Sequence, residues 1–399
     1  MLKLRSINKT NFDNYIKKQK NFSHFMQTSA WGEFEKVTKQ VTPHYLGLFS
    51  NDKLIAAVLL IEEYLPLNQC RLSAPQGFII DYKNNKLLTV FINKIKNFAK
   101  YKKAISLRIT PTIYYKKKYN DEIVLNKDSG KIISNLKQVG FKKKKESNLL
   151  EYNYKIDLSK SLEEIRKAYS EKINNFILST EEYDMELVEG TYKELQDLLK
   201  QNEKNRNYYE TLYEIFSNND YTQVKLLIGK LHITKTLKKI EKNLKKINNQ
   251  ISIIPIDNLD TNSKKKLNTL RKEKEILNKD LEKFKNYKLQ YGNFITLNHF
   301  LLMEQDKKVW LLAEIDNNEF EETNLSYTVY HECIKYYKNK DFKCIYQLNP
   351  STKNPIKTEF NKDFGSEYVK YIGEYELITN KLMYIAQNKI IPLFKKGEK

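Results

Sequence analysis

The sequence predicts a mixed α/β protein of two domains, with a coiled-coil arm inserted into the second domain. Three observations predict this fold class. The chain has 399 residues and a mass of 47.5 kDa, which is too long for one ordinary hydrophobic core. Apolar runs typical of strands alternate with amphipathic helical segments in both halves. A heptad pattern then interrupts the strands of the second half.

The first unit covers residues 1–148 and alternates helical and extended segments. Helical spacing of apolar residues is found over residues 11–19, 29–38, 84–103 and 130–141. Runs typical of strands cover residues 44–50, 53–64 and 104–111, and residues 76–82 are typical of a strand end. Gly140 is a good residue to end the last of these helices.

The second unit covers residues 149–231 and 292–399. Strands are expected at residues 149–159, 223–231, 293–304, 309–315 and 342–348. Helices are expected at residues 161–177, 191–205, 208–218 and 327–339. Ser161 and Glu164 have the spacing of a capping box at the start of the first of these helices. The similar order of elements in the two halves suggests two related units.

The insertion at residues 232–291 has the clearest local pattern in the chain. Its first segment repeats apolar residues at spacings of four and three, and its second segment keeps heptad register after a short linker that contains Pro255. The apolar positions are Ile233, Leu237, Ile240, Leu244, Ile247 and Ile251, and then Leu267, Leu270, Leu277, Leu281 and Phe284. Two such helices predict an antiparallel coiled coil, each helix roughly 30 Å long.

Charge and cysteine usage limit the class of protein. The chain has 70 Lys and Arg residues against 49 Asp and Glu residues, a net charge of +21. Such a surface attracts nucleic acid, acidic phospholipid or phosphorylated substrates, although a lysine-rich proteome would produce the same excess. The three cysteines, Cys70, Cys333 and Cys344, lack the spacing of a zinc site, and a reducing cytoplasm fits them. No signal peptide or membrane span is expected, so any membrane contact would be peripheral, at the inner face of the cell membrane.

Several common catalytic motifs are absent from the sequence. No two glycines lie two positions apart, which excludes the usual dinucleotide-binding and acetyl-coenzyme-A pyrophosphate loops. GxSxG and HExxH are also missing, and the five histidines are scattered. The residues therefore indicate no protein nucleophile, no metal site and no cofactor.

A series of weak motifs nevertheless occurs in a specific order. Phe25, Gln27 and Trp31 form the pattern F-x-Q-x-x-x-W, and "APQGFIIDY" (74–82), "LRITP" (107–111) and "LKQVGF" (136–141) follow. After the heptad segment come "SYTVYHECIKYYKNKDFKCIYQL" (326–348) and "FNKDFGSEYVKYIGEYE" (360–376). In this order the motifs resemble, over essentially the whole chain, the Fem family of peptidoglycan interpeptide-bridge aminoacyltransferases. The heptad insertion is similar to that of the glycyl-adding branch.

This resemblance implies a fold and a reaction. The fold would be two acetyltransferase-like (GNAT-type) domains, the second of which carries the arm. The reaction would move an amino acid, often glycine, from aminoacyl-tRNA onto the side-chain amine of a lipid-linked or nucleotide-linked peptidoglycan precursor. Because the ester is already activated, such an enzyme needs proximity, a base and positive charge rather than a nucleophile. The protein would act as a monomer or a weak oligomer in the cytoplasm.

The resemblance also implies site residues. Lys36 would contact the precursor diphosphate, with Lys172, Arg206, Tyr209 and Trp31 as further substrate-binding residues. For Trp31 core packing is the simpler role, and Lys36 can equally be a solvated lysine.

The implied catalytic residues lie in "FNKDF" (360–364), where the family lysine that stabilises the oxyanion corresponds to Asn361. Either the adjacent Lys362 substitutes for it, or Asn361 donates a hydrogen bond, or catalysis is impaired. Two further charged positions of the family pattern are neutral here, since Asn174 replaces an arginine and Thr110 an aspartate.

These departures keep a second class of function open. A catalytically degenerate family member would bind a precursor or a partner enzyme as a scaffold in cell-wall synthesis, without turnover. A basic coiled-coil protein that binds nucleic acid, unrelated to the cell wall, is a third hypothesis. The ordered motifs argue against it.

Overall fold

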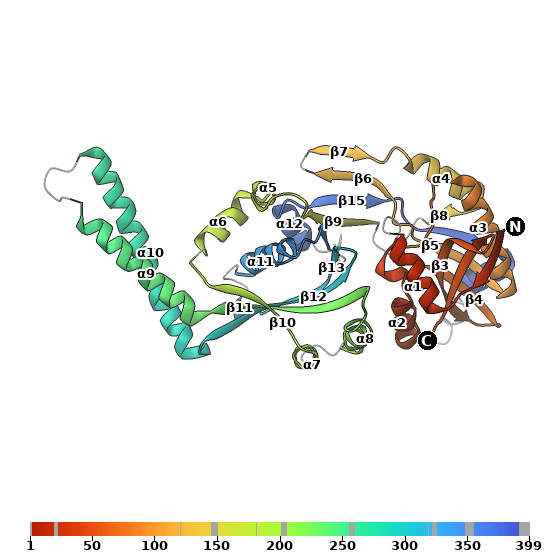
Figure 1. Cartoon of the computed structure of the whole chain (residues 1–399), viewed down its shortest axis with the longest axis horizontal. Coiled ribbons are helices and arrows are strands. Elements are labelled where there is room, and N and C mark those ends of the chain that lie inside the picture. Colours follow the sequence, from red (N-terminus) through yellow and green to blue (C-terminus); the bar gives the residue numbers. More distant parts are fainter. Residues whose placement is uncertain are drawn as a thin grey trace.

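The computed structural model describes residues 2–19, 23–119, 121–144, 151–180, 182–200, 206–254, 260–317, 319–320, 325–347 and 355–390. The molecule is elongated (Figure 1), with the N-terminal domain at one end and a pair of long helices at the other. Two sheets form its framework, one of seven strands and one of nine.

The first sheet is antiparallel except where β4 pairs with β5 in parallel. In spatial order its strands are β1 (Leu2–Ser6), β2 (Thr42–Ser50), β3 (Lys53–Leu65), β4 (Gln69–Ala74), β5 (Ala104–Ile109), β16 (Tyr375–Ile378) and β8 (Lys142–Lys143). Its helices are α1 (Lys9–Lys18), η1 (Phe25–Gln27), α2 (Ser29–Lys39), α3 (Asn85–Tyr101) and α4 (Ser129–Gln138). The last described elements are α13 (Lys381–Ile385) and η4 (Ala386–Ile390).

The second sheet repeats this pattern, with β13 and β14 as its parallel pair. In spatial order its strands are β10 (Met185–Glu189), β11 (Thr222–His232), β12 (Phe294–Gln305), β13 (Lys308–Asp316), β14 (Cys344–Gln347), β9 (Tyr152–Asp157), β15 (Glu367–Tyr371), β6 (Tyr114–Tyr119) and β7 (Glu122–Leu125). Its helices are α5 (Leu162–Lys167), α6 (Glu171–Ser179), α7 (Tyr192–Leu199), α8 (Arg206–Phe216), α11 (Leu325–Asn339) and α12 (Pro355–Asp363).

The two halves exchange strands. β16, from the second half of the chain, lies between β5 and β8 of the first sheet. The β6–β7 hairpin also joins the second sheet although it precedes residue 148. The strands are therefore not divided between the sheets at the boundary that the sequence suggests.

Three apolar clusters pack against the two faces of the two sheets. Alternate residues of one strand belong to different clusters because successive side chains point to opposite faces. On β13, Val309 and Leu311 pack with α11, whereas Trp310 packs with the helices of the first domain. On β3, Val58 and Leu60 pack with α3, whereas Leu59 belongs to the same cluster as Trp310. One apolar layer therefore joins the inner faces of both sheets.

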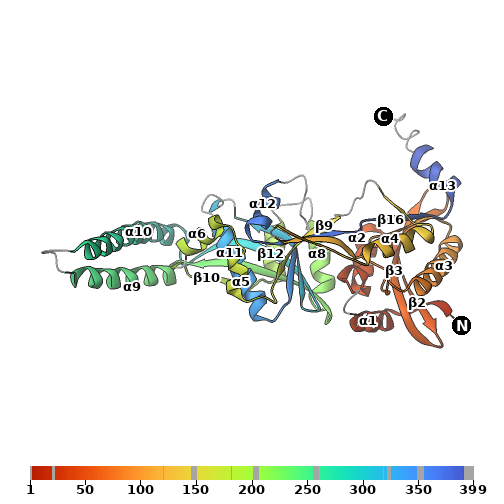
Figure 2. The same cartoon turned by 90° about the horizontal axis from the view of Figure 1, so that it is seen from above.

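The arm consists of α9 (Ile233–Ser252) and α10 (Thr261–Tyr291), inserted between β11 and β12. The two helices lie side by side and run in opposite directions (Figures 1 and 2). Buried apolar side chains follow the predicted heptad positions at Leu237, Ile240, Leu244, Ile247, Leu267, Leu270 and Phe284. The insertion is thus an antiparallel helical hairpin, and its supercoiled packing stays a prediction.

One expected strand is wrong. Residues 76–82 form a turn with a single bridge between Ala57 and Ile79 instead of a strand end. Within this turn the backbone N–H of Phe78 donates to the Tyr82 hydroxyl, so a local side chain takes a bond that a neighbouring strand would accept. By contrast, the capping box of Ser161 and Glu164 is confirmed, with both reciprocal hydrogen bonds formed.

Candidate functional site

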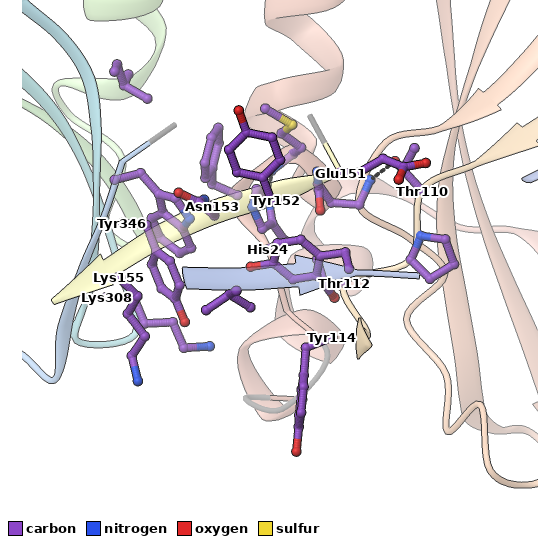
Figure 3. A pocket seen from close by; sticks show the side chains of 18 of the residues that line it. His24, Thr110, Thr112, Tyr114, Glu151, Tyr152, Asn153, Lys155, Lys308 and Tyr346 are labelled. Carbon is purple, nitrogen blue, oxygen red and sulfur yellow. Dashed lines mark hydrogen bonds between the residues drawn. The ribbon is translucent and has the colours of Figure 1, made fainter. Parts of the chain in front are cut away.

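A cavity of about 630 Å³ lies where the first domain meets the inner face of the second sheet (Figure 3). The first domain contributes η1 with the start of α2, and the loops that follow β4 and β5. The second domain contributes α8 and the strands β9, β13, β14 and β15. Neither half of the chain could enclose this space without the other.

The floor of the cavity follows from strand alternation. Lys308, Trp310 and Leu312 of β13 all point into it, as do Asn153 and Lys155 of β9. These residues are two positions apart, so they share one face of the sheet. The same spacing brings in Tyr346 from β14, and Val369 and Tyr371 from β15.

The fully buried Gln27 fixes the part of the first domain that faces this floor. Its Oε1 accepts a hydrogen bond from the backbone N–H of Leu59 at 2.9 Å, and its Nε2 donates to the carbonyl oxygens of Pro75 and Leu59 at 2.7 and 3.2 Å. A Cβ atom on Gly77 would come within 2.6 Å of the Gln27 side chain, so only glycine fits there. Gln27 therefore fixes η1 against β3 and against the loop after β4.

Aromatic rings cross the boundary between the domains at the cavity wall. The Phe25 ring meets Trp31 at 5.4 Å and Trp310 at 5.1 Å, both edge to face. Trp31 is 5% exposed, and its buried indole N–H has no hydrogen-bond partner among the described residues. A buried donor without a partner is costly, so this N–H is available to a ligand in the cavity.

Charge is distributed unevenly in the cavity. Lys155 and Lys308 lie together at one end, whereas Glu151 lies toward the other end, near Thr110 (Figure 3). The Glu151 carboxylate is about a quarter exposed and pairs with Lys143 at 3.4 Å. Glu374, a second carboxylate in the lining, is almost fully buried and lies 3.4 Å from Lys144. The cavity thus presents cations at one end and a partly exposed carboxylate at the other.

Burial determines the protonation state of His24 and Tyr208 in the cavity wall. Desolvation, with a smaller effect of Lys308, lowers the pKa of His24 to about 3, so its imidazole is neutral at pH 7. The His24 Nδ1 accepts from the Met26 N–H at 3.1 Å, which leaves the proton on Nε2. Burial also raises the pKa of Tyr208 to about 12, with smaller effects of Glu35 and Tyr209, so this hydroxyl stays protonated.

The structure places two of the predicted substrate-binding residues in the lining of this cavity and two more on helices that border it. Trp31 and Tyr209 line it. Lys36 and Arg206 are not among the lining residues, but they lie on α2 and α8, two helices that contact each other where the Phe34 ring meets Tyr208 at 4.9 Å. The Arg206 guanidinium pairs with Glu210 at 2.9 Å, and Lys36 is exposed. Both cations therefore lie on helices that form the rim.

The other three predicted residues lie across the second sheet from the cavity. Asn361 and Lys362 belong to α12, and Lys172 belongs to α6. These helices pack with α11 on the outer face of the sheet, where the Lys172 ammonium lies 5.5 Å from the Tyr327 ring and that ring stacks on Phe360. Asn361 is 3% exposed, whereas Lys362 is exposed. The structure does not bring the predicted catalytic pair and the cavity residues into one site.

Most of the residues that line the cavity were not predicted from the sequence. Glu151, Lys155 and Lys308 line the cavity with charged side chains but belong to no catalytic motif. The one available signal was the period-two alternation along 308–312, which indicates a shared face but not what that face covers. Among the described residues, no group of three or more His, Cys, Asp or Glu side chains is arranged to hold a metal ion.

Two sheets with matching strand orders define the class of protein, a tandem acetyltransferase-like fold. The fold is similar to that of a tandem GNAT protein from the clavulanic acid biosynthesis pathway, with a TM-score of 0.50 and 6% identity over 95% of this chain and 99% of that one. The predicted fold class is therefore confirmed.

The family is also defined. The model of the FemAB family matches residues 7–391, and the chain belongs to that family. The crystal structure of FemX is similar over 96% of this chain and 98% of that one, with a TM-score of 0.77 and 16% identity. The lipid II:glycine glycyltransferase of Staphylococcus aureus is 22% identical over 421 residues, which span 97% of this chain and 95% of that one. The resemblance drawn from the ordered motifs is confirmed.

Proposed function

We propose that this protein transfers glycine from aminoacyl-tRNA to the side-chain amine of a peptidoglycan precursor, and so builds an interpeptide bridge. The observation that carries the proposal is the uneven charge of the cavity. A precursor has anionic groups that suit Lys155 and Lys308, and an amine that suits Glu151. The similarity to a lipid II:glycine glycyltransferase over almost the whole length of both chains supports the same acceptor.

The chemistry requires few groups from the protein. The acceptor amine attacks the ester carbonyl carbon, the C–N bond forms, and the ester C–O bond breaks. In this proposal Glu151 holds the acceptor ammonium and takes one of its protons, since its carboxylate is more exposed than that of Glu374. The departing ribose hydroxyl takes up a second proton from the nitrogen. No covalent enzyme intermediate is needed, because the ester is already activated.

The arm supplies a cationic surface for the tRNA donor. Together α9 and α10 carry sixteen Lys or Arg residues against five Asp or Glu residues. A tRNA backbone is recognised mainly through such phosphate contacts, so the affinity for the donor should fall steeply with salt. Solubility of the helical hairpin would also favour charged outer faces, and only binding measurements separate the two explanations.

The proposed catalytic group on the outer face is Lys362, with Asn361 beside it. For Lys362 to stabilise the oxyanion, the acyl end of the donor must approach α12, while the acceptor occupies the cavity. Since Glu151 and Lys362 lie across the second sheet from each other, they cannot act on one carbonyl in this arrangement, and an unchanged rate in Lys362→Ala would assign the reaction to the cavity and remove this role of Lys362.

The test is a transfer assay with purified protein, charged glycyl-tRNA, and lipid-linked and nucleotide-linked precursors offered separately. Glu151→Gln, Lys362→Ala and Lys36→Ala should each slow transfer more than tenfold. Glu163→Gln and Lys167→Ala, a carboxylate and a lysine that pair with each other on the exposed surface of α5, serve as controls and should leave the rate unchanged. The enzymatic proposal fails if no glycine reaches either precursor where a known family member succeeds.

A second candidate is a scaffold protein that binds the precursor without turnover. It is favoured by the neutral residues at two charged family positions, Asn361 on α12 and Thr110, which lines the cavity. Calorimetry separates the two candidates, because a scaffold predicts precursor binding of normal affinity in a protein that forms no product.

A further inference from the structure

The end of the first sheet that lies farthest from the cavity carries large apolar side chains in solvent. Three segments meet there, residues 64–68, 100–103 and 381–388, and we call them the distal end. The Cys70 N–H donates to the Lys103 carbonyl at 3.5 Å, and the Gln387 side chain donates to the Pro66 carbonyl at 2.6 Å. The cavity is at the other end of the sheet, because β4 and β5 both run from the distal end toward it.

The exposed apolar residues of the distal end come from all three segments. Tyr64 is 64% exposed, Leu67 is 66% exposed, and Tyr101 and Leu382 are each 82% exposed. Figure 2 shows α13, which carries Leu382, projecting from the body of the domain. Single exposed apolar residues are ordinary on protein surfaces, but a group from adjoining segments marks an interaction surface.

Leu67 is unfavourable in this turn for two reasons. Its backbone is in the left-handed region, with a φ of 64°, and Asn68 beside it has a φ of 54°. Glycine and asparagine adopt this conformation readily, whereas a larger side chain is strained in it. Leu67 is also exposed, so burial inside the protein does not offset the strain. An apolar contact with a surface outside the chain would offset the strain.

The charged residues near Leu67 indicate what kind of surface would contact it. Every charged residue in the three segments is a lysine: Lys100, Lys102, Lys103 and Lys381. Lys102 pairs with Glu62 at 3.1 Å, while Lys100, Lys103 and Lys381 are exposed. A second copy of the same patch would bring like charges together. An anionic lipid surface accepts both the apolar side chains and the lysines.

We propose that the distal end docks this protein onto an anionic lipid surface, with Leu67, Tyr101 and Leu382 at the level of the headgroups. The inference rests on the proposed function, because a lipid-linked acceptor requires the enzyme to work at a membrane. Since β5 has six residues, the cavity would stand about 20 Å from the lipid surface. The peptide branch of a lipid-linked precursor has to cover that distance.

The experiment is co-sedimentation of the whole protein with vesicles, in the absence of donor and acceptor. Vesicles of phosphatidylcholine with phosphatidylglycerol should bind the protein, vesicles of phosphatidylcholine alone should not, and added salt should release it. Leu67→Asn should lower binding about tenfold while the melting temperature stays equal or rises, because asparagine suits the left-handed backbone. The double variant Lys100→Gln/Lys103→Gln should lower binding about 25-fold at low salt.

Matched controls locate the effect. Leu289 on the arm is 87% exposed, and Leu289→Gln should leave vesicle binding unchanged. If Leu67→Asn has no effect while Lys279→Gln/Lys285→Gln on the arm releases the protein, docking belongs to the arm and the inference is wrong. Sedimentation velocity without vesicles tests whether a second copy of the protein covers the patch. A change of oligomeric state in Leu67→Asn would assign the patch to that second copy and overturn the proposal.

The two proposals can fail separately. Leu67→Asn should transfer glycine to a nucleotide-linked precursor in solution as fast as the unaltered protein. If the unaltered protein binds anionic vesicles but transfers nothing, the proposed function fails and the docking surface stands. If it transfers glycine but ignores vesicles, the docking surface is refuted and the function stands.

Discussion

Substitution of Gln27 by leucine should destabilise the first domain, because this side chain replaces strand pairing in the wall of the cavity. Leucine has a similar volume but offers no hydrogen bonds. It leaves the Leu59 N–H and the Pro75 carbonyl without their partner, in a place where the side chain is 0% exposed. An unsatisfied buried group costs about 1–3 kcal/mol, and the apolar gain of leucine offsets roughly 1 kcal/mol.

Two such groups cost about 2–6 kcal/mol, so the net loss in the free energy of unfolding is about 1–5 kcal/mol, and each kcal/mol lowers the melting temperature by roughly 2–4 °C. Circular dichroism during thermal unfolding measures it. Gln69→Leu is the control, since that amide only meets two carbonyls of its own exposed turn at 3.3 and 3.4 Å. A loss below about 0.5 kcal/mol for Gln27→Leu would refute the reasoning, because that is the range of ordinary surface substitutions.

Three further predictions concern stability. The folded protein keeps His24 neutral down to a pKa of about 3, whereas the unfolded chain binds that proton near pH 6.5, so its contribution to stability is present above pH 6.5 and is lost as the pH falls. In His24→Asn, which keeps a capping acceptor, the free energy of unfolding measured in urea should vary less with pH between pH 4 and 6. The difference in slope should correspond to about one proton fewer taken up on unfolding. Gly365→Ala should destabilise the fold by several kcal/mol in the same assay, since φ is +61° and the added Cβ would lie 2.4 Å from the Ala168 carbonyl oxygen. Glu376→Gln should cost about 3 kcal/mol, because the buried carboxylate accepts hydrogen bonds from Arg108 and Ser106 at 2.8 Å, and hydrogen exchange should show the loss of protection in β5.

The sequence is sufficient where the physical signal is local. The heptad positions from Leu237 to Phe284 locate the arm, because the 3.5-residue repeat needs no knowledge of the rest of the chain. Gly140 ends its helix as expected, with a φ of +100°, a backbone region that favours glycine. The capping box at Ser161 depends on only four residues, and it too is confirmed.

The pairing of strands that lie far apart in the sequence could not be predicted from such local patterns. Nothing in residues 375–378 indicates that this strand pairs with β5 rather than continuing from β15, because any extended segment offers the same backbone groups to either partner. The β6 strand is rich in lysine and tyrosine, and these residues do not indicate that its partners are β7 and the distant β15. Lys155 and Lys308 could not be distinguished among 70 basic residues until the sheet placed them on one face.

The strand exchange also explains why the cavity depends on both halves of the chain. Glu374, in the cavity lining, directly precedes β16, and Tyr371 of the lining ends β15 in the other sheet. Four residues therefore connect the cavity wall to both sheets. A movement of one domain relative to the other has to change the backbone at residues 372–374, where Gly373 has a φ of +94°. The chain also passes from β5 of the first sheet to β6 of the second, and residues 110–112 of that connection line the cavity, so a second connection holds the domains together beside it. The domains should accordingly unfold as one cooperative unit, and a fragment of residues 1–148 should not fold by itself, because its sheet lacks the strand between β5 and β8.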